Sequence, residues 1–148
     1  MQASTFGIKS NVLVQLFDAN GAIKETREIH NAVTDAGIYG VMDQILAAPS
    51  LPKMGWMEVG TGSVATAGHL QTYISGSRVA FTSKVRGLKV VTVVGDFAAG
   101  VGTGAITEAG TFDVVTQNTA NCWMYATFTA INKQAADTLK ITWTLTGA

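Results

Sequence analysis

Residues 139–146, Leu-Lys-Ile-Thr-Trp-Thr-Leu-Thr, alternate strictly between apolar and polar side chains. Successive side chains of a strand point to opposite faces of its sheet, so this period of two predicts a strand with one buried and one solvent-exposed face. Burial on one face only is typical of antiparallel sheets. The end of the chain therefore indicates an antiparallel β fold.

The opposite end of the chain carries the pattern of a β-hairpin. Residues 11–18 and 22–29 have extended patterning, and Asp18-Ala-Asn-Gly21 lies between them. An Asn-Gly pair can supply the positive φ angles of a tight turn. Further strands are predicted over residues 56–59, 78–84, 88–97, 106–115 and 121–131, with 78–84 and 88–97 paired through a turn near Arg86-Gly87. The pattern of residues 63–75 fits both a loop and a helical turn, and the sequence does not decide between them.

One segment has the pattern of a helix, about residues 35–47. Thr34 is suited to cap its first turn, and Asp35 places negative charge at its positive end. Pro49 and Pro52 end it. Apolar residues follow at spacings of three and four, which predicts that one stripe packs over an end or edge of the sheets; they are Ile38, Val41, Met42, Ile45 and Leu46.

Seven or eight short strands and one helix predict a mainly β fold, either an antiparallel β-sandwich or a jelly-roll-like barrel. The chain has 148 residues, the size of one domain. Residues 1–10 are small and polar, so we expect a flexible N-terminal arm there. Residues 11–148 are then a single β-rich domain.

Charge and cysteine content limit the function classes. Ten Lys and Arg balance ten Asp and Glu, which argues against a nucleic-acid duplex or an anionic membrane as partner. Charged residues make up only 14% of the chain, so we expect partner proteins to cover part of the surface. Cys122 is the single cysteine, and no apolar run has the length of a signal peptide or a membrane span. We therefore expect no disulfide within the chain, no membrane partner and synthesis in a reducing cytoplasm.

Candidate metal and nucleophile residues are few. His30, His69 and Cys122 have no short spacing of the kind that zinc sites use, so we expect three unrelated side chains and no cofactor. Glu58 and Glu108 are acids inside otherwise apolar segments and could form a carboxylate pair. Each lies beside a glycine turn, which favours a role in fixing the loop through backbone N–H groups.

The glycine-rich segment, the basic residues and the tryptophans each have a structural explanation that needs no ligand. The glycine-rich segment 98–104 lacks the Lys-Ser/Thr of a phosphate-binding loop, so we interpret it as a flexible connection. Lys84, Arg86 and Lys89, with Arg78 nearby, suggest a solvated hairpin tip or a contact with an acidic partner. We assign the three tryptophans to the core, although an exposed one would favour carbohydrate binding. We therefore expect no enzymatic activity.

Five stretches in this order resemble a group of small virion proteins of tailed phages. They are Leu16-Phe-Asp-Ala-Asn-Gly21, His30-Asn-Ala-Val-Thr-Asp-Ala-Gly37, Val59-Gly-Thr-Gly62, Ile106-Thr-Glu-Ala-Gly-Thr-Phe112, and Ile131-Asn-Lys133 with residues 137–145. The similarity spans nearly the whole chain. Its motifs are turn-like, and their order is more specific than any one of them. The family has no catalytic residues to assign here.

The resemblance implies a non-enzymatic structural protein on the virion, made in the host cytoplasm. We expect a capsid decoration (cement) protein on the capsid surface, a dimer or trimer that binds the major capsid protein at seams between its subunits. The arm 1–10 and glycine loops 60–68 and 98–104 would reach across those seams. A tail or tail-fibre subunit bound to tail proteins is the alternative, and a carbohydrate-binding module is more distant.

Overall fold

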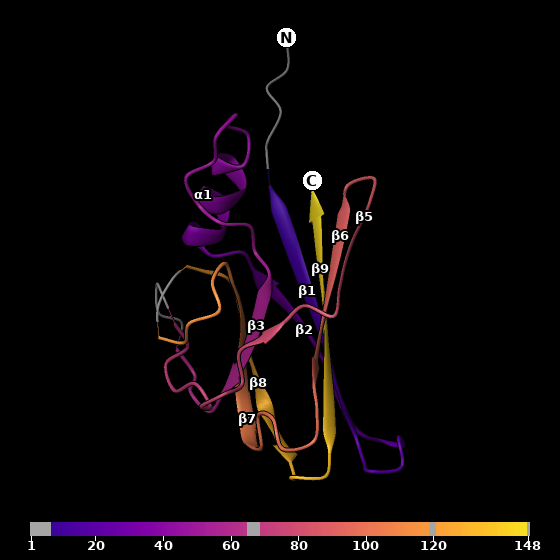
Figure 1. The fold of residues 1–148 in the computed structure, drawn as a ribbon. Coiled ribbons are helices and arrows are strands. Elements are labelled where there is room, and N and C mark those ends of the chain that lie inside the picture. Colours follow the sequence, from indigo (N-terminus) through magenta and orange to yellow (C-terminus); the bar gives the residue numbers. More distant parts are fainter. Residues whose placement is uncertain (1–6, 65–68, 119–120, 148) are drawn as a thin grey trace.

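The computed structural model describes residues 7–64, 69–118 and 121–147. Its strands form two antiparallel sheets that face each other (Figure 1). The five-stranded sheet has the order β2-β1-β9-β6-β5, and the four-stranded sheet has the order β4-β3-β7-β8. The predicted mainly β class and sandwich-like arrangement are confirmed, whereas the jelly-roll description is not.

The first hairpin joins β1 (Ile8–Phe17) to β2 (Ile23–Ala32) as predicted, but with another turn geometry. Gly21 has φ 86°, whereas Asn20 does not adopt a positive φ, and the register shifts between Leu16 and Phe17. Asp18 Oδ1 accepts bonds from the backbone N–H groups of Asn20 and Ala22. Strand β1 begins at Ile8, so residues 8–10 belong to the sheet and not to the predicted arm. Residues 1–6 of that arm lie outside the described residues.

Strand β9 (Thr138–Gly147) lies at the centre of the five-stranded sheet, between β1 and β6 (Val90–Phe97). Its predicted alternation is confirmed, because Leu139, Ile141 and Trp143 are buried. The Trp143 indole N–H donates to Ser10 Oγ at 2.8 Å, which satisfies its one polar atom inside the core. The core between the sheets includes Val12, Val14, Leu16, Met57, Val59, Val93, Phe97, Ile106, Ala109, Met124, Ala126 and Ile131.

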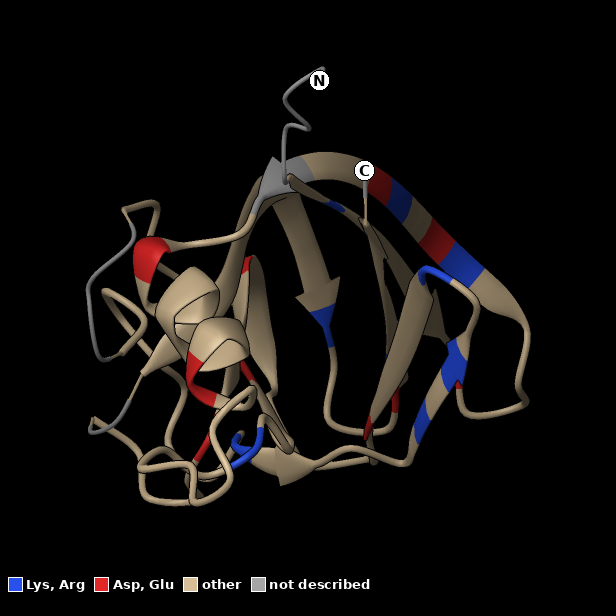
Figure 2. Ribbon diagram, turned by 90° about the horizontal axis from the view of Figure 1, so that it is seen from above, with Lys and Arg blue, Asp and Glu red and all other residues tan. Residues whose placement is uncertain are grey.

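Charged residues gather on the edge strands of the five-stranded sheet, which Figure 2 shows as blue and red bands on the ribbon. Strand β2 contains Lys24, Glu25, Arg27 and Glu28, and edge strand β5 (Ser83–Gly87) contributes exposed lysine and arginine side chains. Charge on an edge strand opposes pairing with the edge of another molecule.

The predicted strand 78–84 is divided between the two sheets. Strand β4 (Val79–Ala80) pairs with β3 (Trp56–Gly60) in the four-stranded sheet, whereas β5 pairs with β6 in the other. The turn between β5 and β6 lies at Leu88-Lys89, two residues later than predicted. The chain therefore passes from one sheet to the other at residues 81–82.

The outer face of the four-stranded sheet carries a second apolar cluster. Leu70, Phe112 and Cys122 are buried there, with Trp56, Tyr73 and Tyr125 packed around them. Phe112 ends β7 (Gly104–Phe112), and Cys122 begins β8 (Cys122–Lys133). The segment that follows β3 therefore covers this face, and its described residues 69–78 form no helix.

Helix α1 (Asp35–Asp43) is shorter than predicted, and its apolar stripe does not pack as predicted. The buried helix residues are Gly37 and Gly40. A Cβ at Gly37 would lie 2.1 Å from Trp123 O, and one at Gly40 would lie 2.3 Å from the Trp123 ring. The helix thus packs on β8 through its two glycines, because only glycine permits so close an approach.

Candidate functional site

Helix α1 and the turn directly after it carry an exposed apolar surface, which we call the helix patch. It consists of Tyr39, Met42, Ile45 and Leu46, with exposed fractions of 67%, 50%, 74% and 57%. Contiguous exposed apolar groups on a soluble protein usually mark an interaction site. The sequence predicts that three of these residues, Met42, Ile45 and Leu46, pack over an end or edge of the sheets, and for these three the prediction is wrong. The signal it missed is Gly37 and Gly40, which share one face of the helix at a spacing of three.

The helix patch is mounted on a firmly anchored helix. Thr34 N donates to Trp123 O at 3.0 Å, and the Thr34 hydroxyl donates to the carbonyl oxygens of Cys122 at 2.5 Å and Trp123 at 3.0 Å, which share its one proton. Thr34 Oγ1 also accepts the Gly37 N–H at 3.0 Å, which confirms the predicted N-cap. The Trp123 indole N–H is held in turn by Asp113 Oδ2 at 3.3 Å. These bonds fix the start of α1 to β8.

The end of the helix is fixed by Asp43. Its carboxylate accepts the Ser50 hydroxyl at 2.6 Å and the backbone N–H groups of Ser50 and Leu51 at 3.2 and 2.9 Å. The hydrogen bond from the Ser50 side chain, together with that from Leu51, lowers the pKa of Asp43. The loop after α1 is therefore tied back to the helix, and the helix patch is a defined surface at both ends.

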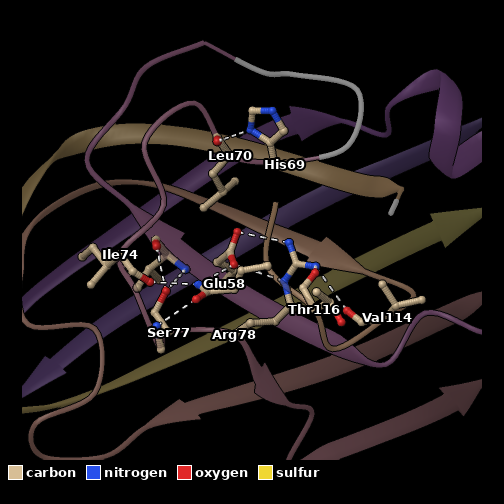
Figure 3. Close-up of polar contacts among 11 residues, drawn as sticks. Glu58, His69, Leu70, Ile74, Ser77, Arg78, Val114 and Thr116 are labelled. Carbon is tan, nitrogen blue, oxygen red and sulfur yellow. Dashed lines mark hydrogen bonds and ion pairs between the residues drawn. The ribbon is translucent and has the colours of Figure 1, made fainter. Parts of the chain in front are cut away.

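A buried ion pair lies beneath the loops that cover the four-stranded sheet (Figure 3). Arg78 Nε donates to Glu58 Oε2 at 3.1 Å and Arg78 Nη2 to Glu58 Oε1 at 3.2 Å. Arg78 Nη1 reaches the Val114 carbonyl at 3.2 Å, and the guanidinium lies 3.7 Å from the Phe112 ring centre. The sequence analysis placed Arg78 near an exposed basic cluster. That placement is wrong, because Arg78 is 7% exposed and its charge is neutralised inside the protein.

Gln117 completes the environment of Glu58. Its amide nitrogen donates to Glu58 Oε2 at 2.7 Å and to the Ile74 carbonyl at 2.9 Å. Its amide oxygen accepts the Gly76 N–H at 2.8 Å. One carboxylate, one guanidinium and one amide thus join strand β3 to the two loops above it.

Glu108 fixes a neighbouring part of the loops that cover the four-stranded sheet. Its carboxylate accepts backbone N–H groups from Gly62 at 3.0 Å and Thr72 at 2.9 Å, and the Tyr125 hydroxyl at 2.6 Å. Burial and the Glu108 hydrogen bond raise the pKa of Tyr125. Glu108 therefore fixes the loop through backbone N–H groups, as predicted, whereas Glu58 does so through side chains. Gly62 of the predicted glycine loop is hydrogen-bonded to Glu108, and residues 65–68 lie outside the described part of the chain.

The remaining candidate residues are dispersed. His30 is exposed on β2, His69 is half-buried with Nδ1 2.7 Å from the Leu70 carbonyl oxygen, and Cys122 is buried with Sγ 3.3 Å from Met124 O. Within residues 7–64, 69–118 and 121–147, no three His, Cys, Asp or Glu side chains are grouped so as to hold a metal ion.

The thiol of Cys122 gives a prediction about alkaline pH. Burial raises its pKa from about 9 to about 12, so above pH 9 the unfolded chain loses this proton while the folded chain keeps it. The contribution of this thiol to the free energy of unfolding is therefore fully present below pH 9 and is lost as the pH rises toward 12. The free energy of unfolding, measured in urea, should fall between pH 8 and about 11. The fall should be smaller in Cys122→Ala. Equal declines in the two proteins would contradict the assignment.

The basic residues of the β5–β6 hairpin and two of the tryptophans differ in exposure. Lys84, Arg86 and Lys89 are exposed, and we call them the basic cluster; Lys84 donates to the Met54 carbonyl at 3.0 Å. Trp123 and Trp143 are 6% and 0% exposed, so their assignment to the core is confirmed. No helix among the described residues is long and apolar enough to span a membrane.

The helix patch is therefore our candidate interaction site. Comparison of the chain with protein-family models, with curated proteins and with solved structures gave no match.

Proposed function

We propose that the chain is a non-enzymatic structural protein of a tailed-phage particle, a capsid decoration protein that binds where major capsid subunits meet. The observation that carries this proposal is the helix patch, four exposed apolar side chains on α1 and the turn directly after it, both of which are held in place by hydrogen bonds. The order of the sequence motifs supplies the phage context. A binding surface on a stiff scaffold suits a protein that opposes separation of its neighbours.

The energetics of the helix patch suit this role. Complete burial of a Leu, Ile or Met side chain stabilises by about 1.5–3 kcal/mol relative to exposure. These side chains are still half or more exposed, so each retains roughly 1 kcal/mol of this stabilisation for a partner. A decoration protein binds in many copies, so a moderate energy at each site adds up over the shell.

The centre of the five-stranded sheet offers a second surface of low charge. Thr142 lies between Leu13 of β1 and Val94 of β6, and Thr144 lies opposite Thr92. All five side chains are half-buried and uncharged. Such a face loses its water at little cost, because it holds no unpaired charge to desolvate.

Binding to particles tests the function. Purified protein should bind phage shells that lack it, and the double substitution Met42→Lys with Ile45→Lys should weaken binding by at least about tenfold, a loss of about 1.4 kcal/mol. The substituted side chains are exposed, so the melting temperature should change little. Ile23→Lys is the matched control, because Ile23 is 59% exposed but lies outside the helix patch.

An image of the labelled particle locates the chain. Density over seams between capsid subunits, in hundreds of copies, supports the proposal. Density confined to the tail, in a few copies, would instead establish the tail-subunit alternative. Binding to glycans with a change in tryptophan fluorescence would establish the carbohydrate-binding alternative, although the two most buried tryptophans offer no platform for a sugar.

A further inference from the structure

An apolar groove lies at the end of the molecule that carries the β5–β6 turn, the end of β9 and α1 (Figure 1). It has a volume of about 220 Å³ and is lined by Ile8, Val41, Lys89, Val91, Leu145 and Gly147. Lys89 is the one charged residue among them, and none is acidic. No residue of the helix patch lines the groove, so the groove is a separate surface.

The basic cluster borders this groove. Lys89 is a lining residue, and Arg86 lies directly opposite Val91, another lining residue, in the pairing of β5 with β6. Lys84 lies opposite Val93, so it projects from the same face of β5 as Arg86. All three basic side chains are exposed. An apolar depression therefore has positive charge along one side.

The charge of the basic cluster is not neutralised within the described part of the chain. Residues 59–95 contain no Asp or Glu. Lys84 and Arg86 donate to backbone carbonyl groups, which carry no charge. The ion pairs between described residues all involve other side chains. The cluster is thus a local excess of positive charge on a chain whose formal net charge is zero.

The tip of the hairpin adds an exposed apolar side chain between these basic residues. Gly87 pairs with Val90, so Leu88 and Lys89 form a two-residue turn. Leu88 has φ 53° and is 92% exposed, in a position that normally holds glycine. Leucine is disfavoured there because its Cβ crowds the backbone. Strained residues cluster at binding sites, so we include Leu88 in the surface.

We propose that the groove and the basic cluster bind an acidic segment of a partner protein. The segment places one apolar side chain in the groove and a second against Leu88, and its carboxylates pair with the basic cluster. Opposite charge steers such a segment to the site and rejects basic partners. A second copy presenting the same end of the molecule is rejected for that reason. The inference does not rest on the proposed virion role.

The number of basic residues favours a short protein segment over other acidic partners. Anionic membranes are recognised by clusters of about four to eight basic residues. Proteins that bind duplex DNA commonly make about six to ten phosphate contacts. The basic cluster has three members, and the groove beside it requires an apolar side chain, which a polypeptide supplies together with its carboxylates.

Fluorescence anisotropy tests the site with a fluorescein-labelled peptide, Asp-Glu-Leu-Asp-Glu-Leu-Asp-Glu. Its affinity should fall as NaCl is raised, because salt screens the charges. Replacing its acids by Asn and Gln, or its leucines by Ser, should each raise the dissociation constant at least about tenfold. Absence of binding at about 1 mM protein, or equal affinity for the three peptides, would overturn the proposal.

A charge reversal locates the bound peptide. Lys89→Glu should raise the dissociation constant at least about tenfold. Lys140→Glu is the matched control, because it changes the net charge equally at an exposed lysine outside the groove and the basic cluster; it should leave the dissociation constant unchanged. Equal losses in the two variants would mean general attraction between opposite charges and would refute the site.

Leu88→Gly separates binding from folding. Glycine accepts the positive φ without strain, so the melting temperature should not fall, while the dissociation constant should rise at least about threefold. Wild-type affinity in this variant would contradict the proposal. Tighter binding of phosphatidylserine vesicles or duplex DNA than of the peptide would overturn it in favour of those partners, as would self-association that excludes the peptide. Particle binding by the helix-patch variants is scored separately and concerns only the proposed function.

Discussion

Replacing Arg78 by methionine is expected to lower the free energy of unfolding by about 3–5 kcal/mol. The substitution leaves the Glu58 carboxylate, which is 0% exposed, without its counter-ion. Gln117 still donates one hydrogen bond, but a neutral amide does not compensate a buried charge. The loops that Arg78 joins to β3 through the Val114 carbonyl would also lose their link. Urea denaturation at pH 7 measures the effect.

Two controls distinguish the buried pair from ordinary loss of charge. Arg27→Met removes a half-exposed arginine that pairs with Glu25 at 3.4 Å, and should cost less than about 1 kcal/mol. Glu58→Leu combined with Arg78→Met should cost clearly less than the sum of the two single substitutions, because the double variant has no orphaned charge. Additive losses would show that the two side chains stabilise the protein independently.

Gly37→Ala is expected to destabilise the protein by about 2 kcal/mol and to displace α1 from β8. Alanine favours a helix over glycine by about 1 kcal/mol, so propensity alone predicts stabilisation. The new methyl group would however lie 2.1 Å from Trp123 O and 2.7 Å from Val33 Cγ1. The carbonyl belongs to the backbone of β8, which is hydrogen-bonded to β7 along its length, so the helix must shift.

The consequence extends to binding, because the helix patch moves with α1. Gly37→Ala should therefore reduce attachment to particles although no patch residue changes. Gly87→Ala is the control, since nothing lies within 4 Å of a Cβ at Gly87 in the described structure and its φ is not positive. Thermal melting and particle sedimentation measure the two effects. Unchanged melting in Gly37→Ala would mean that the helix does not depend on this close approach.

Local patterns predicted the strands because strand burial depends on alternation alone. Residues 139–146 alternate in the sequence and in the structure, since each inward side chain meets the opposite sheet whatever its partner. The turn at residues 18–21 was located from its Asn-Gly pair, which is also a local signal. Its detailed type was not, because Asp18 binds the backbone and Gly21 alone adopts the positive φ.

The orientation of α1 could not be obtained from hydrophobicity. Apolar periodicity placed Met42, Ile45 and Leu46 toward the sheets, yet the helix approaches β8 so closely that only Gly37 and Gly40 fit. The size of Trp123, about ninety residues later, decides this distance. A contact between residues so distant in the sequence leaves no local periodic signal.

The burial of Arg78 likewise depends on residues far along the chain. Glu58 precedes it by 20 positions, and Gln117 follows Glu58 by 59. Without knowledge that these segments meet above one sheet, an arginine between a turn and a strand is expected on the surface. The candidate site was missed for a related reason, since exposure of an apolar helix face is a property of the tertiary fold.

The pairing of β1 with β9 has a consequence for biosynthesis. Their register runs from Ile8 opposite Gly147 to Phe17 opposite Thr138, so the middle of the larger sheet joins the first and last strands. Residues 138–147 must therefore leave the ribosome before this sheet can close. Loop closure over such a separation is slow, and a prematurely terminated product lacks the strand that completes the hydrophobic interior. Only translation products that include β9 would then complete the larger sheet.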